Sequence, residues 1–303
     1  MNSLILQKQE EVIALAQFDI KDAVLKKCLL KEDETVITVP DGVTTIGKDA
    51  LCGLQSVIAV TLPESLKVIN DGAFYGCSSL TSVTLPGSVE RLGSCAFAQC
   101  STLNTIYLDN KLTEIGNSAF WGCTSLESID IPAGITKIGY NLFGSCLSLI
   151  SVSLPDTVTE LDERAFKECT SLACITLPDS LIKIGNMAFL NCHNLKSVNI
   201  PDRLESIGEK AFFMCESLHE LEIPDVIASV GGDAFSDCVS VTVRSTISGK
   251  PIYKAVTATD GSSAYNFILR NICGKWFLTT NARHTKYCGG YAPGDKLHRT
   301  CRQ

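Results

Sequence analysis

A 23-residue motif organises most of the chain, and residues 80–100, LTSVTLPGSVERLGSCAFAQC, are one complete copy of it. Three residue types keep fixed places in the copies. The prolines are Pro40, Pro63, Pro86, Pro132, Pro155, Pro178, Pro201 and Pro224. The phenylalanines are Phe74, Phe97, Phe120, Phe143, Phe166, Phe189, Phe212 and Phe235, and a cysteine follows each of them three residues later. A fixed period in the twenties predicts a solenoid, in which each copy forms one coil that stacks on the next.

The order of apolar and polar residues within one copy predicts the path of a coil. Residues 80–85 alternate between apolar and small polar side chains, which predicts a short strand that Pro86 ends. The apolar pair within residues 89–92 predicts a second strand on the opposite wall. Gly93 and its equivalents are glycine, asparagine or aspartate, so we expect a left-handed corner there. Residues 96–100, AFAQC, are expected to form a helical or 3₁₀ turn that buries their phenylalanine and cysteine.

This motif resembles the leucine-rich repeats of the BspA-like family, which form the treponemal class of such repeats. The family pattern of an L-x-x-I-x-L-P strand, an I-G corner and an A-F-x-x-C turn appears here as LTSVTLP with LGSCAFAQC, and again as LESIDIP with IGYNLFGSC. The departures are Leu51 for the first phenylalanine, Leu142 for an alanine and Asp109 for a proline. The resemblance implies a β-rich α/β solenoid. It would be a right-handed superhelix of about nine coils, each with two short strands and a helical turn.

The repeat divides the chain into three expected parts. Residues 1–34 would form an N-terminal cap: a helix over residues 3–17 and then a hairpin in FDIKDAVLKKCLL. Residues 35–243 would form the solenoid. Residues 244–303 would form a C-terminal cap and a basic tail, with strands at PIYKAVTA and GKWFLTT and a helix at GSSAYNFILRNI. Caps are expected because an end coil otherwise exposes apolar core and strand edges.

The placement of the 15 cysteines predicts free thiols rather than disulfides. Eight of them, from Cys77 to Cys238, occupy one position in successive coils, where a cysteine acts as a small apolar residue. The N-terminus lacks the pattern of a secretory signal, and the chain has no apolar run long enough to span a membrane. We therefore expect a reduced protein in the cytoplasm. A location at the cell surface is the alternative that the family resemblance implies.

The outward-facing strand residues predict a polar surface on the concave side of the solenoid. They form two columns, mostly of serine and threonine, on nine strands that extend over roughly 40 Å. That length suits a protein partner, whereas a solvated sheet of β-forming residues is the simpler interpretation. The members that break the pattern are the candidate partner-binding residues Tyr107, Asp130, Asn199, Glu220 and Glu222. Three aromatic residues that share another position, Tyr75, Trp121 and Phe213, are either anchors at a groove edge or packing between coils.

Motifs for catalysis or cofactor binding are missing from the sequence. A weak candidate metal site in the tail comprises His284, Cys288, His298 and Cys301, whose spacing lacks paired-cysteine knuckles. The net charge of −7 disfavours nucleic acid as the main partner. The basic tail would contact either an acidic partner or the acidic solenoid itself. We therefore expect a monomeric, non-enzymatic scaffold without a cofactor that binds a protein. An adhesin-like role or chemistry in the tail is the alternative.

Overall fold

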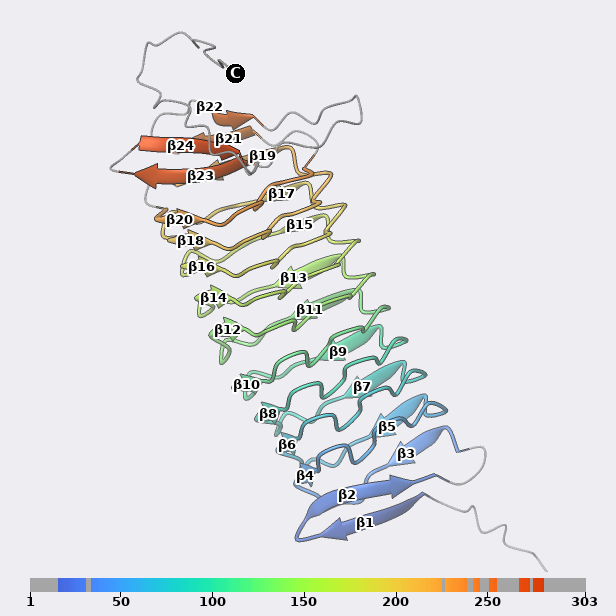
Figure 1. Ribbon diagram of the computed structural model, residues 1–303. Coiled ribbons are helices and arrows are strands. Elements are labelled where there is room, and N and C mark those ends of the chain that lie inside the picture. The colour runs from blue at the N-terminus through green and yellow to red at the C-terminus, as the bar shows by residue number, and fades with distance from the viewer. Residues whose placement is uncertain are drawn as a thin grey trace, which may run out of the picture.

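The computed structural model describes residues 16–30, 34–224, 227–238, 242–245, 251–254, 267–272 and 275–280. The backbone winds into a β-solenoid of about nine coils, which stack into an elongated column (Figure 1). Each coil contributes two short strands, and equivalent strands of successive coils pair in parallel, mostly 23 residues apart. The repeat period therefore predicts the solenoid correctly, whereas the right hand of its winding stays a prediction.

One side of the column, the long-strand wall, consists of the first strand of each coil. These strands are β3 (Val36–Thr38), β5 (Ala59–Thr61), β7 (Ser82–Thr84), β9 (Thr105–Tyr107), β11 (Ser128–Asp130), β13 (Ser151–Ser153), β15 (Cys174–Ile175), β17 (Ser197–Val198) and β19 (Glu220–Ile223). They form the ladders β3-β5-β7-β9, β11-β13 and β15-β17, and β19 pairs with β21 (Thr242–Ser245), which pairs with β22 (Pro251–Lys254). The second residue of a strand, such as Ile37, is buried and its neighbours Val36 and Thr38 are exposed. This alternation is the one that the sequence predicts.

The opposite side, the short-strand wall, consists of two-residue strands. These are β4 (Thr45–Ile46), β6 (Val68–Ile69), β8 (Arg91–Leu92), β10 (Glu114–Ile115), β12 (Lys137–Ile138), β14 (Glu160–Leu161), β16 (Lys183–Ile184), β18 (Ser206–Ile207) and β20 (Ser229–Val230). Their two ladders run β2-β4-β6-β8-β10 and β12-β14-β16-β18-β20. The second residue of nearly every strand is buried, so the two walls enclose one continuous apolar core.

The third side, the turn wall, corrects the expectation of a helical turn, because the described residues contain no helix. In residues 95–100 the backbone alternates between two kinds of hydrogen bond. Phe97 N donates to Ala119 O of the next coil at 2.8 Å, whereas Cys100 N donates to Phe97 O within the same turn at 3.2 Å. In a helix, the backbone N–H groups after the first turn would all donate to carbonyls of the same helix. The turn wall instead uses about half of them to join coils, so the fold is all-β rather than α/β.

The position of the left-handed corner also differs from the expectation. Gly93 does not have a positive φ, but Cys95 and Gln99 do, at 54° and 61°. Gly93 and most of the equivalent glycines serve a different purpose, since a backbone atom of the preceding coil lies within 3 Å of the place where their Cβ would be. A Cβ added to Gly116 would lie 2.5 Å from the carbonyl carbon of Gly93. Glycine therefore occupies this corner for lack of a side chain rather than for backbone freedom.

The two positive-φ columns of the turn wall contain mostly residues that have a Cβ. The first column contains Asp49, Cys95, Ser118, Asn141, Arg164, Met187, Lys210 and Asp233, and Gly72 is its one glycine among the described residues. A left-handed conformation costs an L-residue about 1–2 kcal/mol. The repeat tolerates this cost because neighbouring coils fix each corner.

We expect Met187→Gly to raise the free energy of unfolding by about 0.5–1 kcal/mol. The substitution removes the cost of a left-handed L-residue, which exceeds the roughly 0.5–1 kcal/mol of backbone entropy that glycine loses on folding. Met187→Ala is the matched control, because it shortens the side chain and keeps the strained φ of 56°. Urea denaturation measures both. A glycine variant no more stable than the alanine variant would contradict the role of strain.

A column of stacked phenylalanine rings fills the core behind the turn wall. From Phe74 to Phe235 the centroids of successive rings lie 4.9–5.9 Å apart, and the planes of neighbouring rings differ by 4–15°. The rings are almost fully buried, and Leu51 takes the same place in the first coil. Because each ring packs between the rings of two neighbouring coils, the energy of one coil depends on both neighbours.

The two ends of the column contain antiparallel pairs. At the N-terminal end, β1 (Gln17–Lys21) and β2 (Val24–Leu29) form the predicted hairpin. Its turn residues Asp22 and Ala23 both have positive φ, and β2 pairs with β4. At the C-terminal end, β23 (Phe267–Ile272) pairs with β24 (Lys275–Thr280), and β23 lies beside β20. The prediction of a helix through Phe267–Ile272 is therefore wrong. The missed signal is the two-residue spacing, with a glycine at its second position, between two apolar runs. The helix expected over residues 3–17 lies almost entirely outside the described residues.

Candidate functional site

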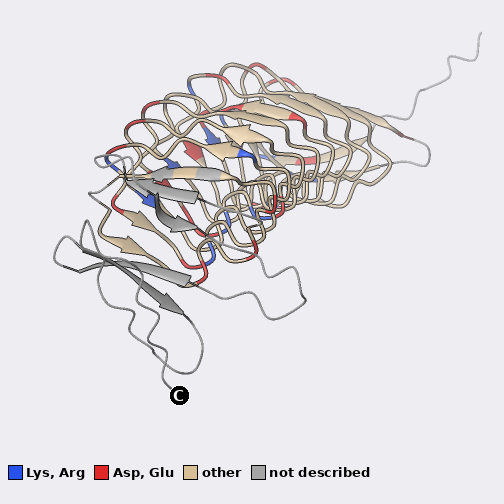
Figure 2. Ribbon diagram, turned by 90° about the horizontal axis from the view of Figure 1, so that it is seen from above, with Lys and Arg blue, Asp and Glu red and all other residues tan. Residues whose placement is uncertain are grey.

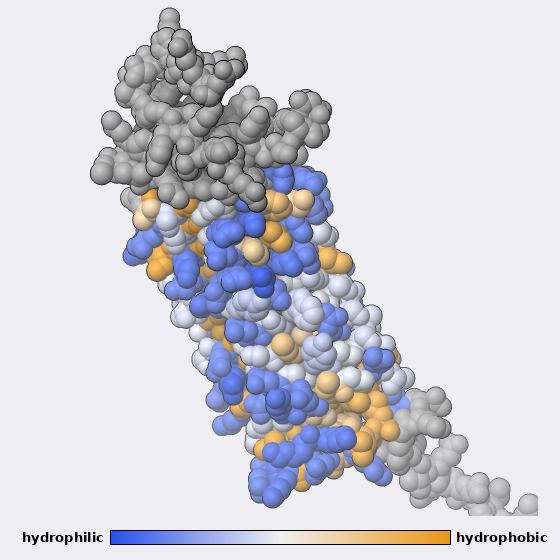
Figure 3. Space-filling view, in the orientation of Figure 1, coloured by the Kyte–Doolittle hydropathy of each residue, from blue (hydrophilic) through white to orange (hydrophobic). Residues whose placement is uncertain are grey.

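The long-strand wall presents the two polar columns that the sequence predicts. Tyr107 ends β9 with 66% of its surface exposed, and Asp130 ends β11 and is also exposed. Between and beyond them lie mostly serine and threonine, and Cys174 is exposed in β15. Figure 3 shows hydrophilic residues over much of the visible face of the column and hydrophobic ones near its N-terminal end. At that end, Val36 and Ile58 are half exposed.

The candidate partner-binding residues fall into two groups along this wall. Tyr107 and Asp130 occupy equivalent positions in neighbouring coils. Asn199 follows β17 three coils beyond Asp130, at a distance of roughly 14 Å along the column. Glu220 and Glu222 lie in β19, but their side chains are outside the described part of the structure. The wall thus separates the candidates into an N-terminal and a C-terminal group.

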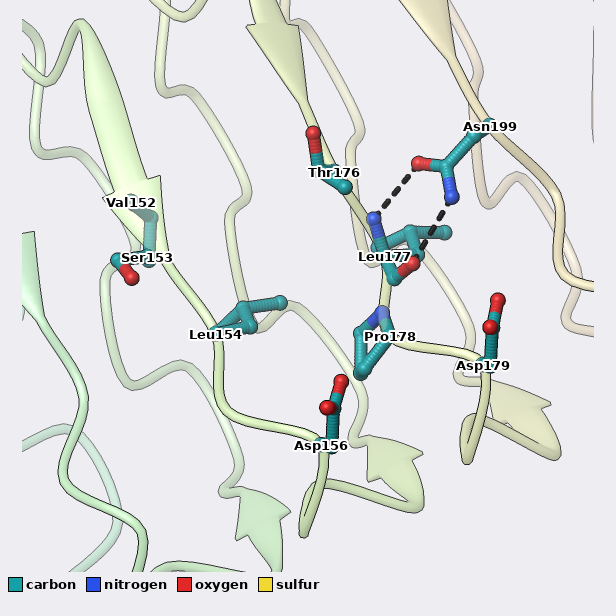
Figure 4. Close-up of a pocket in the computed structure, with 9 residues that line it drawn as sticks. All are labelled: Val152, Ser153, Leu154, Asp156, Thr176, Leu177, Pro178, Asp179 and Asn199. Atoms are coloured by element: carbon teal, nitrogen blue, oxygen red, sulfur yellow. Dashed lines mark hydrogen bonds between the residues drawn. The ribbon is translucent and has the colours of Figure 1, made fainter.

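A hollow of about 450 Å³ lies beside the C-terminal group, where the strands turn at their prolines (Figure 4). Serine and threonine hydroxyls, a proline ring and two carboxylates surround it. The lining residues are Val152, Ser153, Leu154, Asp156, Thr176, Leu177, Pro178, Asp179 and Asn199. No basic side chain is among them, so the hollow is polar and acidic.

Asn199 has a structural role that the sequence does not reveal. Leu177 N donates to Asn199 Oδ1 at 2.7 Å, and Asn199 Nδ2 donates to Leu177 O at 2.8 Å (Figure 4). In an earlier pair of coils the equivalent bond is backbone to backbone, from Ile131 N to Ser153 O at 3.0 Å. The Asn199 amide therefore replaces one backbone rung and shortens β15 and β17 to two residues. A partner would have to compete with both of these bonds.

Asp156 and Asp179, which the strand argument overlooks, bring negative charge to the hollow. Each follows the proline that ends a strand, and both are exposed. Asp202 occupies the same position in the next coil. The signal was available in the sequence, since Pro-Asp recurs in consecutive copies. It was missed because a turn residue was not expected to share a surface with the strands.

The aromatic residues Tyr75, Trp121 and Phe213 lie on the turn wall rather than beside the hollow. Tyr75 is 39% exposed, and the other two are partly buried. Equivalent positions in the coils on either side of Trp121 hold Ala98 and Gly144, both buried. From Tyr75 to Gly144 large rings alternate with small residues, which favours packing between coils over anchoring for Tyr75 and Trp121.

The cysteine column forms hydrogen bonds that composition alone does not suggest. Cys146 Sγ donates to Phe120 O at 3.2 Å, and Cys123 Sγ donates to Phe97 O at 3.1 Å. All eight cysteines of the column, spaced 23 residues apart from Cys77 to Cys238, bond in this way to the carbonyl 26 residues earlier. Burial raises the pKa of Cys146 to about 12 and the pKa of Cys123 well above its ordinary value. These thiols are structural groups and poor nucleophiles.

We expect thiol reagents to label the native protein at Cys52 and Cys174, which are exposed, and more slowly at Cys95. The column from Cys77 to Cys238 should react only after denaturation, because its thiols are buried and protonated. Mass spectrometry of labelled peptides distinguishes the sites. All twelve cysteines among the described residues are free. A disulfide between neighbouring coils would contradict the assignment.

The described residues contain neither a metal-binding cluster nor a membrane-spanning helix. No group of three or more histidine, cysteine, aspartate or glutamate side chains there could hold a metal ion. The weak metal candidate, His284, Cys288, His298 and Cys301, lies outside this part of the chain. Nothing in the same residues forms a helix long and apolar enough to cross a membrane.

Comparisons with known proteins agree with this architecture. The model of the BspA type leucine rich repeat region matches residues 19–150 and 136–255, and a family of unknown function matches residues 269–303. A leucine-rich repeat protein from Bacteroides ovatus shares 24% identity at a TM-score of 0.65, over 78% of this chain and 71% of that one.

A second solved structure is described as a leucine rich cell surface protein from Faecalibacterium prausnitzii. It shares 28% identity at a TM-score of 0.59, over 76% of this chain and 74% of that one. No curated protein matches the chain. Because the repeat model spans well over half of the sequence and the geometry of the coils agrees with it, the chain belongs to the BspA type leucine-rich repeat family.

Proposed function

We propose that the protein is a non-enzymatic scaffold that binds a protein partner through the long-strand wall. The observation that supports this most is the double column of exposed, mostly small polar side chains, interrupted by Tyr107, Asp130 and the hollow beside Asn199. The inter-coil ladders hold these groups at a fixed pitch. Because this surface is already ordered, little binding free energy would be lost in ordering it when a partner binds.

The charge of the wall indicates the chemistry of the partner. Asp130, Asp156 and Asp179 face the solvent on the long-strand side, and the lining of the hollow contains no lysine or arginine. A complementary surface would present basic and hydrogen-bonding side chains. Tyr107 would act as the aromatic anchor, since exposed tyrosines are frequent hot spots in interfaces.

Paired variants test the proposal. The intact protein is used to capture a partner from a lysate of its source organism, and the affinity is then measured by calorimetry. Tyr107→Ser and Asp179→Asn should each weaken binding roughly tenfold or more. Lys183→Gln, on the short-strand wall in β16, is the control and should bind normally. Binding that survives both wall variants, or fails equally in the control, would reject the long-strand wall as the interface.

The proposed setting is the cytoplasm, with one chain acting alone. An adhesin-like role at the cell surface is the second candidate, and the relative described as a cell surface protein favours it. Fractionation of the source cells separates the two. Metal-dependent chemistry in the tail stays a further alternative, because residues 269–303 match their own family, one of unknown function. Zinc analysis of the purified full chain tests it.

A further inference from the structure

The stack of coils is interrupted once on the short-strand wall, between β10 and β12. All other neighbouring strands of this wall pair, but β10 ends one ladder and β12 begins the next. The ribbon shows a wider step between these two strands than between their neighbours (Figure 1). We call this place the seam, and define it by Thr113, Glu114 and Ile115 on one lip and Thr136, Lys137 and Gly139 on the other.

Backbone hydrogen bonds found on either side are missing at the seam. Gly116 N donates to Leu92 O at 2.8 Å, and Asp162 N donates to Ile138 O at 2.8 Å. The equivalent bond, from Gly139 to Ile115, is not formed. Ile115 is also only partly buried, whereas its equivalents in all the other coils, such as Leu92 and Ile138, are buried.

The threonine hydroxyl bonds follow the same pattern, although the residues needed for them are present. The Thr113 hydroxyl donates to Glu90 O and the Thr159 hydroxyl donates to Thr136 O, both at 3.3 Å. The Thr136 hydroxyl forms no such bond to Thr113.

Charged side chains of opposite sign also alternate along the middle of this wall. Figure 2 shows that residues of both signs occur along the column. Arg91 pairs with Glu114 at 3.0 Å, and Lys137 pairs with Asp162 at 3.0 Å and with Glu160 at 3.5 Å. Across the seam, Glu114 and Lys137 have opposite charges in equivalent positions and do not pair.

The seam results from a tilt between two coils. A Cβ on Gly134 would contact the Leu112 carbonyl, with the carbonyl carbon 3.3 Å away, so the coils are pinched at the proline corner. Five residues later the backbones of the two coils have parted, because a Cβ on Gly139 would find its nearest backbone atom, Asn117 Cα, only at 4.0 Å. The Asn117 side chain reaches across this gap, and its Oδ1 accepts a hydrogen bond from Tyr140 N at 3.2 Å.

The turn wall stays joined across the seam. Phe120 N donates to Leu142 O at 3.1 Å. Leu142, a buried leucine where most coils have alanine, adds bulk just beyond the parted lip. The pinched corner and the intact turn wall therefore leave one direction in which the two coils can separate.

We propose that the seam is a hinge, whose lips close through the Glu114–Lys137 pair and open about the pinched corner at Gly134. In the closed state Thr136 and Gly139 bond to Thr113 and Ile115, as their equivalents do in the other coils. The ladder of the long-strand wall stops between β9 and β11 too, as it does between β13 and β15 and between β17 and β19. Tyr107 and Asp130 therefore lie on opposite sides of the hinge. If the proposed function holds, opening the hinge changes their separation and so regulates binding.

Hydrogen exchange of the full chain, followed by mass spectrometry, tests the hinge without needing a partner. Amides of Thr136 and Gly139 should exchange at least tenfold faster than those of the matched residues Thr113, Gly116, Thr159 and Asp162. Salt should speed exchange at Gly139 a further two- to fivefold, roughly the effect of one exposed ion pair. Glu114→Gln should produce the same change at low salt and remove the salt dependence.

Glu90→Gln is the control, since it removes an exposed inter-coil pair with Lys67 one coil earlier. It should leave exchange at Gly139 unchanged. If the amides of Thr136 and Gly139 are as well protected as the matched amides of the coil before and the coil after, no seam exists in solution. Fast exchange that responds to neither salt nor Glu114→Gln would mean a fixed tilt and would overturn the hinge. Because exchange reports on the free protein, either failure leaves the proposed binding function standing.

Discussion

Raising the pH from 9 to 11 is expected to unfold the repeat cooperatively. Burial raises the pKa of Cys77, Cys146, Cys192 and Cys238 to about 12, from an ordinary value near 9. It also raises the pKa of the other thiols in the column. A thiol that stays protonated in the folded state and ionises in the unfolded state contributes stability below pH 9. That contribution is lost as the pH rises toward the folded pKa.

The size of the effect follows from the number of thiols. At pH 10 each column thiol has lost on the order of 1 kcal/mol of its contribution, because the unfolded chain releases its proton and the folded chain does not. Eight of them together lose on the order of 10 kcal/mol, which is comparable with the total stability of a typical domain, about 5–15 kcal/mol. The transition should therefore be steep and should release several protons.

Circular dichroism during a base titration measures the transition, and tyrosine absorbance at 295 nm follows the phenols separately. The control replaces Cys146, Cys169 and Cys192 by serine, which can donate the same hydrogen bond and does not ionise in this range. The variant should lose stability at pH 7 and show a shallower dependence on pH. A transition that is unchanged in the variant, or that follows the tyrosines, would contradict the role of the thiols.

Phe120→Ala is expected to lower the free energy of unfolding by about 3–5 kcal/mol. The Phe120 ring is fully buried and stacks on Phe97 at 5.9 Å and on Phe143 at 5.7 Å, so its removal leaves a cavity with rigid walls. Urea denaturation by fluorescence or circular dichroism measures the loss. Phe120→Leu, which keeps most of the volume, should cost less than half as much.

Phe235→Ala should behave differently, because its ring stacks on Phe212 alone among the described phenylalanines and lies in the last coil. We expect it to fray that coil and leave the middle of the stack intact, since each repeat is held by its neighbours. Hydrogen exchange would show faster exchange confined to residues near 227–238. Equal global destabilisation by the two alanine variants would argue against this nearest-neighbour picture.

The period in the sequence predicts the parts of the fold that depend on one coil repeating the next. The strand positions and the exposure of Tyr107 and Asp130 follow from alternation alone. The turn wall was mispredicted because AFAQC has helical spacing, while the backbone forms half of its hydrogen bonds to the next coil. No single-coil pattern can reveal a bond whose acceptor is 22 residues away.

The candidate site was predicted less completely for a related reason. Asn199 was correctly placed on the wall, but its amide replaces a backbone rung, and only a partner in the preceding coil makes that visible. The seam is harder still to predict from the sequence, because Thr136 and Lys137 are ordinary members of their columns. What differs is the tilt of one coil, beside which Gly134 and Leu142 depart from the residues of the neighbouring coils, and the effect of these departures on packing is not visible in the pattern.

The S–H bonds of the cysteine column impose an order on how the chain can mature. Each carbonyl that Cys146 or an equivalent satisfies belongs to a residue synthesised 26 positions earlier. During translation the newest coil therefore always has a buried acceptor that waits for a thiol still to be made. A nascent chain that pauses, or a truncated product, would end in an incomplete coil that is prone to pair with another chain. For this protein the time between coils, more than the strength of any one of them, would set the risk of misassembly.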